Sequence, residues 1–169
     1  MKFLNLGLID YQLALDKQLE IVQSIIDARK ISQSIPDLNL DTVIICSHPS
    51  IVTTGRQTTV DDVFGWKGPL LEISRGGRAT YHGPSQVVIY PILDLKKPRS
   101  NRQPQEIRGY LRALEQAIVE TFSLYNVKTV GRSLQTKSDS STEQDETGVW
   151  YLNKKIANVS KIILNIRQK

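Results

Sequence analysis

Short apolar runs stand between two long helical patterns, and this order constrains the fold more than any other feature. The runs Thr42–Cys46, Leu70–Ser74 and Gln86–Leu95 are bounded by glycine, proline or polar turns, which is typical of buried strands. Pro91 lies inside the third run, so we expect that strand at a sheet edge or at a bulge. After the first run, a loop or a short strand is expected up to Gly55.

Two stretches repeat apolar residues at the spacing of one helical face. The first runs from Asp10 to Lys30, and Asp10 is placed to cap its N-terminus. The second begins at Ile107 and continues for about five turns. Helices and strands in this mixed order predict an α/β (α+β) domain with a mostly antiparallel sheet. The apolar positions are Tyr11, Leu15, Leu19, Val22, Ile25 and Ile26 in the first stretch, and Ile107, Leu111, Leu114, Ile118, Phe122 and Tyr125 in the second.

Near the C-terminus, a polar segment precedes a hairpin pattern. Ser133–Thr147 contains one leucine and no aromatic residue, which predicts a mobile excursion. Gly148–Leu152 and the segment that starts at Lys155 predict two strands, joined by a turn at Asn153-Lys154. Residues 1–169 show no internal repeat and no second boundary, so we expect a single domain.

Composition and charge exclude several classes of protein. The chain is 40% hydrophobic and 23% charged, as globular proteins are, and no apolar run approaches a membrane span. The net charge of +5 favours acidic partners, but the basic residues are scattered, so we expect no nucleic-acid partner. The N-terminus lacks the features of a signal peptide, and Cys46 is the single cysteine. We therefore expect a cytoplasmic protein without an intrachain disulfide.

The segment around Arg75–Arg78 is the strongest candidate for a functional site. Its two central glycines permit close approach of backbone to a ligand, and an arginine flanks them on each side. Thr80 and His82, which can hydrogen-bond a polar group, follow at once. The pattern predicts a site for an acyl thioester or a phosphate-bearing ligand. The alternative is a glycine turn between strands with solvated arginines.

This segment resembles the signature of octanoyl-[acyl-carrier-protein]:protein N-octanoyltransferases, the enzymes that begin lipoate assembly. The family pattern is Arg-Gly-Gly-x-x-Thr-aromatic-His-x-x-x-Gln. Another family-like segment is His-Pro-x-x-x-Thr-x-Gly-Arg, and "DYQLALDKQ", "YPILDL" and "GVW…KKIA" extend the resemblance over residues 4–160. The matching residues are Arg75, Gly76, Gly77, Thr80, Tyr81, His82 and Gln86 in the first segment, and His48, Pro49, Thr53, Gly55 and Arg56 in the second.

The resemblance implies the biotin/lipoate-ligase-like (class II synthetase-like) fold, with helices flanking a mixed sheet. It also implies an acyltransferase of lipoate biosynthesis and protein lipoylation. In this family, a cysteine takes the octanoyl group from octanoyl-acyl-carrier protein. A lysine of a lipoyl domain, in 2-oxoacid dehydrogenases or in the glycine cleavage H protein, then receives it. Neither a cofactor nor a metal is implied.

The resemblance also assigns roles to individual residues. Lys155, in the Lys-Ile-Ala motif, corresponds to the cation that lowers the pKa of the nucleophilic cysteine; the alternative is an exposed strand lysine. Ser160 stands where family members usually have glycine. The implied substrate contacts are Arg75, Gly76, Gly77, Arg78, Ala79, Thr80, Tyr81, His82, Asn158, Val159 and Ser160.

The family's nucleophilic cysteine is expected in a C-terminal portion that residues 160–169 do not resemble. Cys46, at the end of an apolar run, is expected to be a small core residue instead. Three explanations stay open: a truncated gene product, a fragment completed by another chain, or an inactive module that only binds acyl-carrier protein or a lipoyl domain. A further alternative is an ATP-dependent lipoate or biotin ligase of the same fold.

Overall fold

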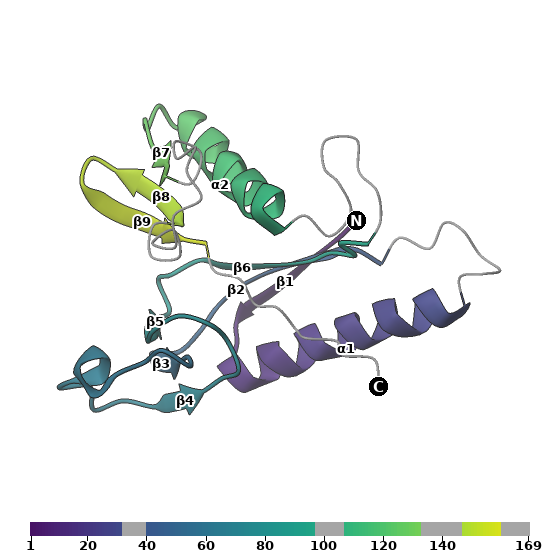
Figure 1. The fold of residues 1–169 in the computed structure, drawn as a ribbon, viewed down its shortest axis with the longest axis horizontal. Coiled ribbons are helices and arrows are strands. Elements are labelled where there is room, and N and C mark those ends of the chain that lie inside the picture. Colours follow the sequence, from purple (N-terminus) through teal and green to yellow (C-terminus); the bar gives the residue numbers. More distant parts are fainter. Residues whose placement is uncertain (32–39, 97–106, 133–146, 160–169) are drawn as a thin grey trace. The chain divides into compact units, whose positions relative to one another are not determined.

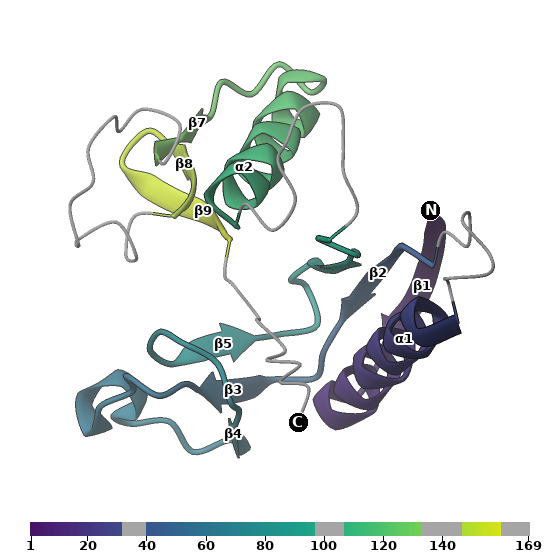
Figure 2. The same ribbon diagram turned by 45° about the vertical axis from the view of Figure 1, so that its right-hand side comes forward.

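The computed structural model describes residues 1–31, 40–96, 107–132 and 147–159. The chain divides into two compact units, each with one α-helix (Figures 1 and 2). Unit 1 comprises Met1–Ser74 and Arg78–Lys97, and unit 2 comprises Arg75–Gly77 and Pro98–Lys169. The polar excursion predicted at Ser133–Thr147, except for Thr147, lies outside the described residues.

The first sheet of unit 1 has three strands, and helix α1 (Tyr11–Ile31) lies beside it (Figures 1 and 2). The strands are β1 (Lys2–Leu8), β2 (Thr42–Ser47) and β6 (Val88–Ile92), in the order β1-β2-β6. β2 pairs parallel with β1 and antiparallel with β6. Among the described strands β6 pairs with β2 alone and is an edge strand, as predicted from Pro91.

Helix α1 begins where the sequence predicts it. Asp10 Oδ1 accepts hydrogen bonds from the amides of Gln12 at 2.8 Å and Leu13 at 3.3 Å, two donors that lack partners inside the helix. The prediction was wrong for Leu19, whose side chain is 43% exposed. Gln18 is buried instead. Its side-chain amide donates to the backbone carbonyl of Ala14 at 3.2 Å, which offsets the cost of burying this polar group. The buried positions are Tyr11, Ala14, Gln18 and Ile25.

The second sheet of unit 1 carries part of the candidate ligand segment. Its strands are β3 (Ile51–Thr54), β4 (Leu70–Glu72) and β5 (Thr80–His82), in the order β4-β3-β5. A 3-10 helix, η1 (Val60–Val63), lies between β3 and β4 in the chain. Strand β4 was predicted, and β3 is the short strand that was expected as an alternative to a loop. β5 was not predicted, because Thr80–His82 contains no run of apolar residues.

Unit 2 packs helix α2 (Ile107–Ser123) against an antiparallel sheet. The strand order is β7 (Val130–Gly131), β8 (Gly148–Tyr151) and β9 (Lys154–Asn158). The predicted hairpin is confirmed, but its turn lies one residue earlier, at Leu152-Asn153. The predicted second helix is also confirmed, except that Tyr125 follows its end and is 75% exposed.

Mixed pairing joins the described strands. The β1–β2 and β3–β4 pairs are parallel, and the other pairs between described strands are antiparallel. The prediction of a mixed α/β architecture with mostly antiparallel pairing is thus confirmed. In the part of the chain that the structure describes, no helix is long and apolar enough to cross a membrane.

Candidate active site

The candidate ligand segment is divided between the two units. Arg75–Gly77 belongs to unit 2, which also contains Lys155, Asn158 and Val159. Arg78–His82 belongs to unit 1. Ser160 lies outside the described residues, so its predicted role stays a prediction.

Arg75 is buried, unlike the solvated arginine of the alternative interpretation. Its side chain is 7% exposed, and its Nη1 donates to the carbonyl of Gly76 at 3.1 Å. Gly77 has a φ of +81°, which glycine adopts without the strain that a Cβ would cause. The conformational freedom of glycine is therefore used at Gly77.

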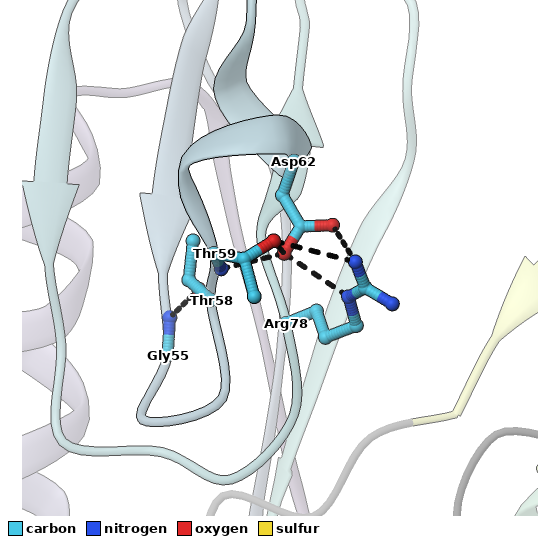
Figure 3. Close-up of polar contacts among 5 residues, drawn as sticks. All are labelled: Gly55, Thr58, Thr59, Asp62 and Arg78. Carbon is cyan, nitrogen blue, oxygen red and sulfur yellow. Dashed lines mark hydrogen bonds and ion pairs between the residues drawn. The ribbon is translucent and has the colours of Figure 1, made fainter.

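Arg78 makes an ion pair inside unit 1 (Figure 3). Its Nε donates to Asp62 Oδ2 at 3.0 Å, and its Nη2 lies 2.6 Å from Asp62 Oδ1. The amide and hydroxyl of Thr59 donate to the same carboxylate at 2.8 and 3.1 Å. The Arg78 guanidinium, helped by Thr59, lowers the pKa of Asp62 from 3.8 to about 2. The ion pair therefore links the backbone that precedes β5 to η1, an interaction that the sequence did not predict.

His82 ends β5 within a group of aromatic rings. Its ring centroid lies 5.3 Å from that of Tyr11 and 5.6 Å from that of His48. Its Nε2 is 3.5 Å from the hydroxyl of Thr53, which is fully buried. The backbone carbonyl of Thr80 accepts from the same hydroxyl at 3.4 Å. β3 and α1 thus set the position of the histidine that the family signature singles out.

His48 is fully buried and bonded through both ring nitrogens. Its Nδ1 lies 2.9 Å from the carbonyl oxygen of Ile9, and its Nε2 lies 3.0 Å from the hydroxyl of Tyr90. A carbonyl can only accept, so Nδ1 donates to Ile9, and in the neutral imidazole Nε2 is then an acceptor. Burial, with a smaller effect of Tyr11, raises the pKa of Tyr90, which keeps this hydroxyl a donor. From the sequence, His48 was identified only as a residue that matches the family pattern, and these hydrogen bonds were not predicted.

The side chain of Tyr81 lies next to the backbone of Gly83, the residue that follows His82. Its hydroxyl lies 3.1 Å from Ser50 Oγ, and its ring meets the edge of Trp66 with centroids 5.6 Å apart. A Cβ at Gly83 would overlap this hydroxyl. A larger residue at this position would therefore displace the Tyr81 ring from its present place.

Lys155 lies on β9, opposite Trp150 on β8. The side chain is exposed, and its Nζ lies 5.8 Å from the centre of the Trp150 ring. Arg132 Cζ lies 3.6 Å from the same centre. Asn158 pairs with Gly148, and Val159 is buried at 7% exposure.

Cys46 is a core residue, as predicted. It is 4% exposed, and its Sγ lies 3.7 Å from His48 Nε2. Burial raises the pKa of the thiol, which disfavours the nucleophilic thiolate. Among the described residues, His, Cys, Asp and Glu side chains form no cluster of three that could hold a metal ion.

Glu115 is a buried charged residue of unit 2 that sequence reasoning missed. It is fully buried, on the apolar face of α2, and its Oε1 accepts from the Gly148 amide at 2.5 Å. An acidic residue four positions after Leu111 and three before Ile118 lies on that face. A glutamate among the apolar positions of the helical pattern could therefore have indicated a buried carboxylate.

Similar proteins share most of this chain. The lipoyl protein ligase A/B catalytic domain matches residues 11–163. The octanoyltransferase of Bdellovibrio bacteriovorus is 43% identical over 158 residues, which cover 93% of this chain and 68% of that protein. The octanoyltransferase of Corynebacterium glutamicum is 38% identical over 128 residues, covering 76% of this chain and 45% of that protein.

A solved structure shares the fold. The T. acidophilum protein Ta0514, assigned to the lipoate protein ligases and solved with bound lipoic acid, superposes with a TM-score of 0.55 at 14% identity. The match covers 92% of this chain and 59% of Ta0514. The chain thus spans about half to two thirds of the length of these relatives.

Proposed function

The chain belongs to the octanoyltransferase family, with its lipoyl protein ligase A/B catalytic domain, and we propose that it acts in octanoyl transfer to lipoyl domains. The observation that carries the proposal is the 43% identity to an octanoyltransferase over 93% of the chain. The donor is octanoyl-acyl-carrier protein. The acceptors are lipoyl domains of 2-oxoacid dehydrogenases and of the glycine cleavage H protein.

The proposed reaction has two acyl transfers. A cysteine thiolate attacks the octanoyl thioester, and the thiol of the carrier protein's phosphopantetheine arm leaves. The ε-amine of a lipoyl-domain lysine then attacks the new thioester, forms an amide, loses a proton and releases the thiolate. The ammonium group of Lys155 stabilises the thiolate in both steps.

Other residues of the chain bind the substrate in this proposal. In unit 2, the loop at Gly76 and Gly77 presents backbone without a Cβ, and Asn158 and Val159 follow Lys155 on the same strand. In unit 1, Thr80 and His82 offer groups that can hydrogen-bond. The net charge of +5 favours acidic carrier proteins, and we place the reaction in the cytoplasm.

Cys46 is not the nucleophile in this proposal, because it is buried and its pKa is raised. The thiolate has to come from outside these 169 residues. The same observation favours a second candidate function, in which the chain only binds octanoyl-acyl-carrier protein or a lipoyl domain.

The test is to titrate the chain with octanoyl-acyl-carrier protein and with the unacylated carrier, and then to add a lipoyl domain. We expect tighter binding of the acylated carrier and no octanoyl adduct on Cys46 by intact mass spectrometry. Lys155→Ala tests the site, with Lys154→Ala as the control. Equal binding of both carriers would contradict octanoyl recognition.

Two further readouts separate the alternatives. Octanoyl transfer to the lipoyl lysine that persists in Cys46→Ser, measured in the presence of the segment or chain that supplies the nucleophilic cysteine, supports the enzyme, whereas binding without transfer under the same conditions supports the binding module. Nucleotide-dependent thermal stabilisation, without preference for the octanoyl carrier, would instead indicate an ATP-dependent ligase.

A further inference from the structure

Glu115 holds the first residue of β8 through a buried hydrogen bond. The carboxylate is fully buried on α2, and its Oε1 accepts from the amide of Gly148 at 2.5 Å. A short bond from an amide to a carboxylate is stronger than one between neutral groups. α2 therefore fixes the backbone at Gly148.

The space beside Gly148 is occupied by the side chain of Lys155. A Cβ on Gly148 would overlap Lys155 Cε, and it would lie 2.5 Å from the carbonyl oxygen of Ala157. The Nζ of Lys155 lies 3.4 Å from the same point. The φ of Gly148 is +149°, which residues with a Cβ rarely adopt. The aliphatic part of Lys155 thus crosses Gly148 in direct contact.

A β-bulge next to Lys155 supports the same geometry. Trp150 pairs with Lys155 and Val149 pairs with Ala157, so Ile156 is the extra residue on β9. Bulges bend a strand and change the direction of side chains, and they are frequent beside active sites. Here the bulge lies directly after the lysine that crosses Gly148.

We infer that Glu115 is a positioning residue for Lys155. By fixing Gly148, its carboxylate sets the surface over which the lysine side chain runs, and so sets where the ε-ammonium group lies. Glu115 itself touches no substrate in this inference. The functional meaning of the position rests on the proposed role of Lys155, whereas the geometry does not.

The test compares the reactivity of two neighbouring lysines in the same molecule. A limiting amount of an acetylating reagent is added at several pH values, and acetylation of Lys155 and Lys154 is measured by peptide mass spectrometry. Glu115→Asp keeps the charge but shortens the side chain, so we expect the Lys155/Lys154 ratio to change by at least about threefold, or roughly half a pKa unit. Glu115→Gln removes the charge but keeps an acceptor of the same reach, so we expect a smaller change than in Glu115→Asp.

Matched variants of an exposed residue on α2, Glu120→Asp and Glu120→Gln, serve as controls. An unchanged ratio in Glu115→Asp, or a change only in Glu115→Gln, would overturn the inference, because the latter pattern indicates charge rather than position. If Glu115→Asp loses its helical circular dichroism, NMR of the unaltered chain decides. Contact between the Lys155 ε-protons and the Gly148 α-protons supports the inference, and its absence refutes it.

This test is independent of octanoyl transfer. If the ratio responds to Glu115→Asp but octanoyl-acyl-carrier protein does not bind, only the proposed function fails. If the carrier binds as proposed but the ratio does not respond, only the positioning role fails.

Discussion

At the scale of single residues, a side chain that the sequence predicts to contact substrate can already form an ion pair or a hydrogen bond within the protein. Arg78 is flanked by the residues of the family signature, but its guanidinium is engaged by Asp62 rather than exposed without a partner (Figure 3). The sequence reveals the cation, but not the carboxylate 16 positions earlier. The same holds for His48, whose partner Tyr90 is 42 positions away. Local patterns cannot show contacts that depend on the tertiary fold.

The Arg78–Asp62 ion pair predicts a specific pH dependence. Because the pKa of Asp62 lies at about 2, below the ordinary 3.8, the pair stabilises the fold fully above pH 3.8 and progressively less as the pH falls toward 2. In Arg78→Gln, we expect the pKa of Asp62 to rise toward 3.8, although Thr59 still donates to it. Carboxyl-carbon NMR titration measures the change. Arg56→Gln is the control, and an unchanged Asp62 pKa in Arg78→Gln would refute the cause assigned here.

At the scale of elements, the sequence predicts long, periodic segments well and short ones poorly. α1, α2, β2 and β6 follow from periodicity, from turn residues and from Pro91. β5 contains no run of apolar residues, and β7 has two residues, too few for a pattern. β1 was missed because apolar side chains occur on both of its faces. Leu4 and Leu6 are half-buried, whereas Phe3 is 71% exposed.

The turn between β8 and β9 carries backbone strain that a substitution can relieve. Leu152 has a φ of +52° and is 83% exposed. Leucine in this left-handed region costs about 1–2 kcal/mol, whereas asparagine tolerates it. We expect Leu152→Asn to raise the free energy of unfolding by about 1 kcal/mol in thermal or denaturant unfolding.

The control for this prediction is Leu124→Asn, which changes another exposed leucine outside this turn. A stabilisation of the same size in both variants would show that lower surface hydrophobicity, not the turn conformation, is the cause.

At the scale of the whole molecule, the chain passes between two compact units at Lys97-Pro98, and the short segment Arg75–Gly77 also belongs to unit 2 although the residues on either side of it belong to unit 1. The single domain expected from the sequence stays a prediction, and nothing in the composition marks the boundary between these two units. Residues with polar or charged side chains lie on both sides of the boundary between Gly77 and Arg78. For that reason the sequence pattern predicted one local site. Each unit contains one of the two tryptophans, Trp66 in unit 1 and Trp150 in unit 2.

The tryptophans allow the stability of each unit to be followed separately. Asp94 is 5% exposed and accepts from Arg29 Nε at 3.0 Å and from the Lys96 amide at 2.9 Å, all within unit 1. Asp94→Asn leaves Arg29 without its counter-charge, and we expect a loss of about 2 kcal/mol. In single-tryptophan variants, the unfolding midpoint reported by Trp66 should fall further than that reported by Trp150.

Asp27→Asn, at an exposed ion pair with Lys30, is the control and should have little effect. Equal shifts of both tryptophan signals in Asp94→Asn would indicate that the two units unfold as one cooperative structure.

Among the described strands, the two edges of the first sheet of unit 1 each carry a feature that would hinder pairing with a strand of another molecule. On β1, the register shifts between Asn5 and Gly7. On β6, Pro91 has no amide hydrogen to donate. A strand from another molecule would therefore meet an irregular edge on one side and a missing donor on the other. Replacement of Pro91 by a residue with an amide hydrogen would remove one of these barriers, leaving exposed Val87 and Ile89 beside an edge open to aggregation.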